Sequence, residues 1–246
     1  MSEPLGHISE IFSSIQGEGI YVGERQVFVR FKGCNLSCDY CDTTEDENSK
    51  SQAPSSKQIS NFKFQDPITV EECVRHINEL TKVSDLHHSV SITGGEPLLQ
   101  VDYLKELLPK IKIKKFLETN GTLFENLSEI IDMLDIIAMD IKLPSATGCD
   151  SYMKQHAKFL EAAFMKDVFV KIVFSKDSLP KEIDDAADLI ASVHNEIPLV
   201  LQPVTPHKSM KNKATAEQCL TFQAIAKRKL KKVLVVPQTH KILGLA

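Results

Sequence analysis

The feature that most constrains the fold is a regular alternation of short β-branched runs with amphipathic stretches. The candidate strands occupy 26–32, 89–95, 114–120, 136–142, 168–174, 199–205 and 232–238. The helix-like stretches occupy 69–82, 101–112, 125–135, 179–193 and 215–230. Strands that alternate with helices form βαβ units and a parallel sheet. Six or seven strands are fewer than the eight of a complete barrel, so an incomplete barrel and an open sheet both fit.

Composition indicates an ordinary globular α/β chain. The 246 residues are 42% hydrophobic and 25% charged, and the net charge of -4 does not favour a nucleic-acid binder of the usual kind. The first 19 residues lack the basic start and apolar run of a signal peptide, and no apolar stretch approaches the roughly 18–20 residues of a membrane span. We therefore expect one cytoplasmic domain over 1–246, with no membrane segment and no directly bound nucleic acid.

One segment interrupts the alternation. Residues 44–66 are rich in Ser, Lys, Asp and Glu and have few apolar anchors. Such a composition is typical of a mobile or inserted surface segment, or of a lid, and does not choose between them.

Three cysteines lie within eight residues, in the loop that follows the first core strand. Cys34, Cys38 and Cys41 have the spacing C-x3-C-x2-C. In a reducing compartment such a group is more typical of a metal or catalytic site than of disulfides. A structural zinc site would need a fourth Cys or His nearby. Three thiolates on a four-iron cluster would instead leave one iron open. The remaining cysteines are single, and Cys73 and Cys219 lie inside expected helices as buried apolar residues.

The cysteine loop and a second motif resemble the radical S-adenosylmethionine (SAM) superfamily. Tyr40 directly precedes the last cysteine, and ITGGEPLLQ (92–100) contains the GGEP of that family. The resemblance implies a partial TIM-type barrel of about six parallel strands with helices outside, and a [4Fe-4S] cluster whose open iron binds SAM. It also implies SAM contacts at Tyr40, Cys41, Asp42, Gly94, Gly95, Glu118, Asp140, Ile141, Lys142, Gln202, Pro203 and Val204. For Asp140 and Lys142, a strand-end ion pair is the alternative.

The segment 10–43, EIFSSIQGEGIYVGERQVFVRFKGCNLSCDYCDT, resembles the start of 7-carboxy-7-deazaguanine synthases. That family contracts 6-carboxy-5,6,7,8-tetrahydropterin to 7-carboxy-7-deazaguanine with loss of ammonia, in the biosynthesis of queuosine and archaeosine of tRNA. The resemblance implies Mg²⁺ at Thr43, a homodimer, and an electron donor such as flavodoxin or ferredoxin. It implies pterin contacts at Ile15, Gln16, Gly17, Arg30, Thr93 and His240. A buried ion pair with a nearby Glu is the alternative for Arg30, and a surface position for His240. No catalytic side chain is expected beyond the cofactors.

Two other functions remain open from the motifs alone. An activating enzyme that installs a glycyl radical on a partner protein shares C-x3-C-x2-C and GGEP, but would lack SIQGEG (14–19) and CDT (41–43). A zinc- or cluster-bearing binding module with no turnover belongs to a different class, and zinc in place of iron would identify it.

Overall fold

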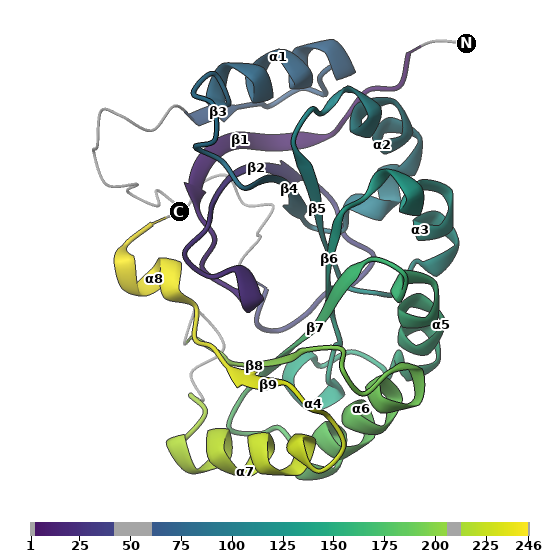
Figure 1. The fold of residues 1–246 in the computed structure, drawn as a ribbon, viewed down its shortest axis with the longest axis vertical. Helices are drawn as coiled ribbons and strands as arrows, with labels where there is room; N and C mark the ends of the chain where they lie inside the picture. The colour runs from purple at the N-terminus through teal and green to yellow at the C-terminus, as the bar shows by residue number, and fades with distance from the viewer. Residues whose placement is uncertain (1–2, 42–60, 206–212, 246) are drawn as a thin grey trace.

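The computed structural model describes residues 3–41, 61–205 and 213–245, and within them the strands form one curved sheet (Figure 1). The strand order is β3-β1-β2-β4-β5-β6-β7-β8-β9. The strands are β1 (Ile8–Ile15), β2 (Arg25–Phe31), β3 (Asn61–Lys63), β4 (Ser89–Gly94), β5 (Lys114–Thr119), β6 (Ile136–Asp140), β7 (Asp167–Phe174), β8 (Leu199–Pro203) and β9 (Val233–Val235). From β2 through β9 each pair is parallel, which confirms the expected partial barrel with parallel strands.

The antiparallel edge of the sheet was not expected. β1 pairs with both β2 and β3 in antiparallel fashion. The strand β3 forms from the last part of the polar segment 44–66, because Phe62 stacks on the ring of His76, with the two centroids 4.0 Å apart. Residues 44–60 lie outside the described part of the chain.

The described residues form eight α-helices, most of which cover the outer side of the sheet (Figure 1). They are α1 (Val70–Leu80), α2 (Val101–Leu107), α3 (Phe124–Ile130), α4 (Pro144–Thr147), α5 (Met153–Ala163), α6 (Pro180–Val193), α7 (Ala216–Lys227) and α8 (Thr239–Leu243). Five match expected stretches, and the hydroxyl of Thr69 caps α1 by accepting from the amide of Glu72. The helices α4, α5 and α8 were not anticipated. In the described ranges, no helix has the length and apolar character needed to cross a membrane.

The two faces of the strands differ in chemistry. Residues such as Val29, Ile92 and Ile172 face the helices and belong to the main apolar core. A second, small cluster lies on the inner face: Phe116, Ile136, Ala138, Phe169 and Val200, contacted by Ile20 and Tyr21. Two residues further along the same strands, the inner face carries Glu118, Asp140, Lys171 and Gln202. The barrel interior is therefore apolar toward the amino ends of these strands and polar toward their carboxyl ends.

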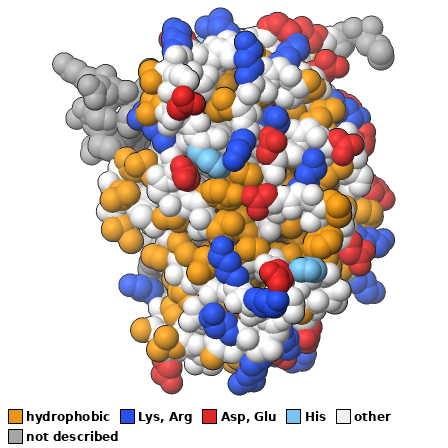
Figure 2. Space-filling model, in the orientation of Figure 1, with side chains coloured by type: hydrophobic (Ala, Val, Ile, Leu, Met, Phe, Trp, Pro, Cys, Tyr) orange, Lys and Arg blue, Asp and Glu red, His pale blue; other side chains and the backbone are white. Residues whose placement is uncertain are grey.

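On the face of the molecule drawn in Figure 2, side chains of both charge signs are interspersed among apolar ones. This mixed surface agrees with the small net charge of the chain.

Candidate active site

The three clustered cysteines lie in the loop that leaves the carboxyl end of β2. Cys34 and Cys41 are exposed, whereas Cys38 is partly buried. The amide of Leu36 donates to Sγ of Cys34 (3.4 Å), and the amide of Asp39 donates to the carbonyl of Thr147, the last residue of α4 (2.9 Å). Asp42 and Thr43, the residues expected at SAM and Mg²⁺, lie outside the described residues.

The chemistry of this loop fits an iron–sulfur cluster. Burial raises the pKa of Cys34, and raises that of Cys38 to about 12, so free thiols here would stay protonated. A bound metal deprotonates its thiol ligands outright. In the ranges 3–41, 61–205 and 213–245, no three Cys, His, Asp or Glu side chains are grouped to hold a single metal ion. A four-iron cluster makes no such demand, because each thiolate binds a different iron.

The two glycines of GGEP bring the end of β4 against the cluster loop. The amide of Gly95 donates to the carbonyl of Phe31 (3.0 Å), and a Cβ on Gly95 would lie 2.0 Å from the carbonyl oxygen of Gly33. Gly94 has φ +118°, and its Cβ would lie 2.2 Å from the carbonyl oxygen of Phe31. Only residues without a Cβ fit these positions, so the glycines fix where the cysteine loop begins.

Glu96, the third residue of GGEP, connects β4 to the end of β5. Its carboxylate accepts from the amides of Leu98 (3.1 Å) and Asn120 (2.8 Å) and from the hydroxyl of Thr119 (2.9 Å). Burial raises the pKa of Glu96 to about 7 although these donors favour the charged form. Asn120 in turn donates to Oδ1 of Asn35 in the cysteine loop (2.8 Å). Glu96 and Asn120 thus hold the loop against the sheet.

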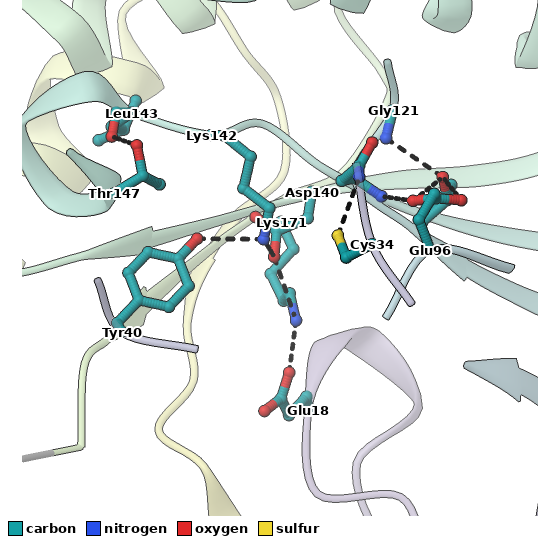
Figure 3. A network of polar contacts seen from close by, with 12 residues as sticks. Glu18, Cys34, Tyr40, Glu96, Gly121, Asp140, Lys142, Leu143, Thr147 and Lys171 are labelled. Atoms are coloured by element: carbon teal, nitrogen blue, oxygen red, sulfur yellow. Dashed lines mark hydrogen bonds and ion pairs between the residues drawn. The ribbon is translucent and has the colours of Figure 1, made fainter. Parts of the chain in front are cut away.

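A chain of alternating charges crosses the interior (Figure 3). Nζ of Lys142 donates to the hydroxyl of Tyr40 (3.1 Å) and to Oδ2 of Asp140 (2.9 Å). The same oxygen of Asp140 lies 3.5 Å from Nζ of Lys171, which pairs with Oε2 of Glu18 at 2.5 Å. Burial would lower the pKa of each lysine, but the acidic neighbours raise it, so both lysines stay charged. The ion pair that was the alternative for Asp140 and Lys142 is therefore present.

Two buried oxygens near the carboxyl ends of β6 and β8 have no hydrogen-bond partner among the described residues: Oδ1 of Asp140 and Oε1 of Gln202. Buried acceptors of this kind are normally satisfied. Both residues were expected at SAM, whose amino and hydroxyl groups are donors, so the residues fit that cofactor. The side chain of Ile141 is in the apolar core and Val204 is 7% exposed, so these two positions, unlike partly buried Pro203, offer mainly backbone atoms.

Gln16 and Glu118, which were expected at different ligands, touch each other. Nε2 of Gln16 donates to Oε1 of Glu118 (3.1 Å) and to Oε1 of Gln26 (3.0 Å). Its own Oε1 accepts from the amide of Glu18 (3.0 Å). Ser91 also donates to Glu118 (2.7 Å). Gln16 therefore orders the loop 15–18 from within.

Arg30 and Thr93 lie side by side on the inner face, because they are register partners on β2 and β4. Nε of Arg30 is 3.2 Å from Oε1 of Glu10 without forming a good hydrogen bond, and the guanidinium lies over the ring of Phe12. The ion pair that was the alternative for Arg30 thus exists. Strand alternation places Ile15 on the opposite side from Gln16, so its side chain faces away from the interior.

The C-terminal segment packs on the loop after β1. The amide of Thr239 donates to the carbonyl of Gly17 (2.9 Å), and Gln238 donates to Oε1 of Glu18 (2.8 Å). A Cβ on Gly17 would lie 2.2 Å from Nδ1 of His240. His240 is therefore in direct contact with Gly17, as expected if both border one pocket.

Several residues of the site escaped the sequence analysis. Lys171 is a lone charge in the apolar run VFVKIVF, and Glu18 belongs to the quoted SIQGEG, so both left a signal. Glu96 lies inside GGEP but received no role of its own. Cys149 is a single cysteine in the sequence, yet in the structure it lies near Cys38 and adds to the effect of burial, which raises the pKa of that thiol. Nothing in the sequence indicates that contact, because α4 was not anticipated.

Known proteins resemble this chain over nearly its full length. Residues 28–166 match the family model of the radical SAM superfamily. The 7-carboxy-7-deazaguanine synthase of Geobacter sulfurreducens is 39% identical over 251 residues, covering 99% of each chain. The enzyme of the same name from Methanothermobacter thermautotrophicus is 34% identical over 257 residues, covering 97% of each. These relatives do not favour the alternative of an activating enzyme for glycyl-radical proteins.

Solved structures show the same fold. QueE from Escherichia coli has a TM-score of 0.58 at 20% identity, covering 96% of this chain and 95% of that one. Streptococcus suis SuiB bound to S-adenosylmethionine has a TM-score of 0.57 at 18% identity, and the match spans 83% of this chain but only 48% of SuiB. Together with the full-length relatives, this places the chain in the radical SAM superfamily, as a member of the family of 7-carboxy-7-deazaguanine synthases.

Proposed function

We propose that this chain converts 6-carboxy-5,6,7,8-tetrahydropterin to 7-carboxy-7-deazaguanine and ammonia, as a radical SAM lyase of deazapurine biosynthesis. The observation that carries the proposal is the buried chain from Tyr40 to Glu18, because it joins the cysteine loop to the SIQGEG loop inside one barrel. A family of synthases aligned across 99% of the chain supports it.

In this proposal, Cys34, Cys38 and Cys41 hold a [4Fe-4S] cluster through three thiolates. The cluster and SAM, when bound, supply one electron and a radical that abstracts hydrogen from the pterin. The contribution of the protein is placement, exclusion of water and electrostatics. Gly94 and Gly95 keep the cysteine loop against β4, which sets the position of the cluster.

The SAM contacts follow from the unsatisfied groups. Asp140 and Gln202 each offer a buried oxygen acceptor. Lys142 holds the carboxylate of Asp140 and the hydroxyl of Tyr40, which connects the end of β6 to the cysteine loop. Backbone atoms at Ile141, Pro203 and Val204 complete this side, and Asp42 and Glu118 are the remaining proposed contacts.

The pterin contacts lie around the loop 15–18. The backbone of Ile15 and Gly17 borders the flat edge of the pterin. The hydrogen bond between Gln16 and Glu118 fixes the shape of the adjacent pocket wall. Arg30, beside Thr93, is suited to the substrate carboxylate because a guanidinium binds a carboxylate in a bidentate manner. His240 covers Gly17 from the C-terminal side. Thr43 is the proposed Mg²⁺ ligand, since Mg²⁺ prefers oxygen donors and retains substrate or water oxygens. A flavodoxin or ferredoxin as electron donor and a homodimer complete the proposal.

The test is anaerobic reconstitution of the cluster, followed by incubation with SAM, a reductant, Mg²⁺ and 6-carboxytetrahydropterin. We expect 7-carboxy-7-deazaguanine by mass spectrometry. Formation of 5′-deoxyadenosine without that product would contradict the substrate assignment.

A Thr43→Ala variant tests the metal assignment separately. We expect a higher Mg²⁺ requirement with an unchanged cluster absorbance. A variant that loses the cluster would indicate that Thr43 supports the loop and does not bind Mg²⁺.

A further inference from the structure

Lys171 is a largely buried charged residue in the middle of β7, where every other residue after Asp167 is apolar. Its neighbours on β7, Val170 and Ile172, face the helices and are fully buried. The side chain of Lys171 faces the barrel interior and is 14% exposed. None of the SAM, cluster or substrate contacts proposed above includes it.

The two carboxylates held by Lys171 belong to different parts of the site. Glu18, at 2.5 Å from Nζ, lies in the loop proposed to border the pterin, where Gln238 holds its other oxygen. Asp140, at 3.5 Å, ends β6 and is bound to Lys142 on the side proposed for SAM. In Figure 3 the side chain of Lys171 lies between these two groups. It therefore connects the substrate side to the SAM side.

The space beneath this connection is too small for a ligand. Lys171, Glu18, Gln16 and Glu118 line a cavity of about 10 Å³, closed below by Phe116, Ala138 and Phe169. A cavity of that size holds about one water molecule. The pterin and SAM must therefore lie beyond it, toward the carboxyl ends of the strands, and Lys171 acts on them through Glu18 and Asp140.

A second lysine offers a direct comparison. Lys229 after α7 also bridges two carboxylates, Asp184 and Asp188, each at 2.7 Å. Those carboxylates are 44% and 64% exposed, whereas Glu18 and Asp140 are 17% and 10% exposed. Water can replace Lys229 as a partner of its two carboxylates, but it cannot reach Glu18 and Asp140 in the same way. Without Lys171, Asp140 would keep Lys142 and Glu18 would keep Gln238, but the connection between the two carboxylates would be lost.

We propose that Lys171 is a positioning residue that fixes Glu18 and Asp140 relative to each other, so that the pterin and SAM meet in the correct geometry. The inference rests on the proposed function. Its consequence is specific: loss of the lysine misaligns the two molecules, so SAM is cleaved without turnover of the pterin.

The experiment compares Lys171→Met with Lys229→Met in the reconstituted enzyme. The readout is the ratio of 7-carboxy-7-deazaguanine to 5′-deoxyadenosine. We expect a fall of about 10- to 100-fold for Lys171→Met, since a misplacement near 1 Å costs about that much. Lys229→Met should keep the wild-type ratio. Lys171→Arg, which keeps the charge, should recover part of the loss.

Two further measurements separate positioning from folding. Calorimetric titration of SAM into the unreduced enzyme should show weaker binding for Lys171→Met, because Lys171 no longer holds the carboxylate of Asp140 in place, and no change for Lys229→Met. Combining Glu18→Gln with Lys171→Met should reduce the ratio little beyond Lys171→Met alone, because both changes break one connection. If Lys171→Met fails to fold, Lys171→Gln takes its place as the variant without the charge. Its product ratio should then be lower than that of Lys171→Arg.

A ratio within twofold of wild type in folded Lys171→Met, or in folded Lys171→Gln, would overturn the inference, as would fully independent effects in the double variant. Absence of the deazaguanine product from the wild-type enzyme would instead overturn the proposed function. The two failures are therefore distinguishable.

Discussion

The two faces of the same strands carry different kinds of side chain: the outer face is apolar, and the inner face is charged near the carboxyl ends of the strands. On β7, Val170, Ile172 and Phe174 are fully buried against helices, while Lys171 points the other way into a network of carboxylates. On β6, Ile137 and Met139 join the main core, while Asp140 lies at the site. Because side chains alternate along a strand, one segment of sequence supplies both the fold and the chemistry.

The difference between the faces is energetic. Each large apolar side chain on the outer face contributes roughly 1.5–3 kcal/mol by leaving water. Each buried charge on the inner face carries a desolvation cost that its ion pair only offsets. Changes on the outer face should therefore reduce stability and leave the reaction of the folded enzyme intact, whereas changes to the inner-face charges should impair the reaction itself.

The largest expected effect on product formation comes from a change in the exposed cysteine loop, which lies outside both faces of the sheet. Cys41→Ala should remove the cluster absorbance and bring product below detection, because a thiolate ligand is lost. Cys41 is exposed and contributes nothing to the core, so thermal unfolding of the cluster-free variant should match that of the cluster-free parent. A variant that still binds the full iron content and makes product would contradict the ligand assignment.

Ile172→Ala tests the outer face one residue away from Lys171. Ile172 is fully buried, and its truncation should cost about 2–5 kcal/mol in the free energy of unfolding. Urea denaturation of the cluster-free protein measures this change. The ratio of product to 5′-deoxyadenosine should stay at the wild-type value below the unfolding transition, and a large fall in that ratio would break the separation of the two faces.

His156 gives a pH dependence with a defined sign. Burial lowers the pKa of His156 from the ordinary 6.5 to about 4, and its Nε2 donates to the carbonyl of Asn120 (3.1 Å). Between pH 6.5 and 4 the unfolded chain binds a proton that the folded chain does not. The contribution of His156 to stability is therefore complete above pH 6.5 and declines as the pH falls, by at most about 1.4 kcal/mol per pH unit.

A His156→Gln variant keeps a donor for Asn120 and removes this titration. Glu96 acts in the opposite direction, because its raised pKa of about 7 lets the folded chain keep a proton that the unfolded chain loses above 4.5. The difference between wild type and variant isolates His156. The free energy of unfolding of wild type minus that of His156→Gln should decrease from pH 7 to pH 4.5 in urea denaturation. A difference that does not depend on pH would contradict the lowered pKa of His156.

Tyr40→Phe should have the smallest effect, because it removes one hydroxyl at the end of the charged chain. The ring remains near Nζ of Lys142, whose distance to the ring centroid is 5.1 Å. Loss of the single hydrogen bond should cost about 0.5–1.5 kcal/mol, so the Kd for SAM should rise by about two- to tenfold. Calorimetric titration measures this, and a loss far beyond that range would give Tyr40 a larger role.

Features that depend on neighbouring residues in the sequence were predictable, whereas features that depend on contacts between distant residues were not. The seven parallel strands were predictable because most of them are local β-branched or apolar runs that alternate with helix-like stretches. β1 was missed because ISEIFSSI mixes polar and apolar residues, and its identity as a strand depends on pairing with β2 and β3. The cysteines and GGEP were predictable because their spacing is local. Lys171 and Glu18 are 153 positions apart, and no local pattern relates them.

The sequence by itself determined the class of fold, the cluster motif and the family, because these depend on short-range periodicity and on motifs that survive as contiguous letters. Tertiary structure alone decided which carboxylate meets which lysine, that Gln16 bonds to Glu118, and that the GGEP glycines clasp the cysteine loop. The physical reason is that curvature of the sheet brings residues from many separate strands and loops into one interior. Because water is largely excluded from this interior, each charge there must pair with another group of the protein.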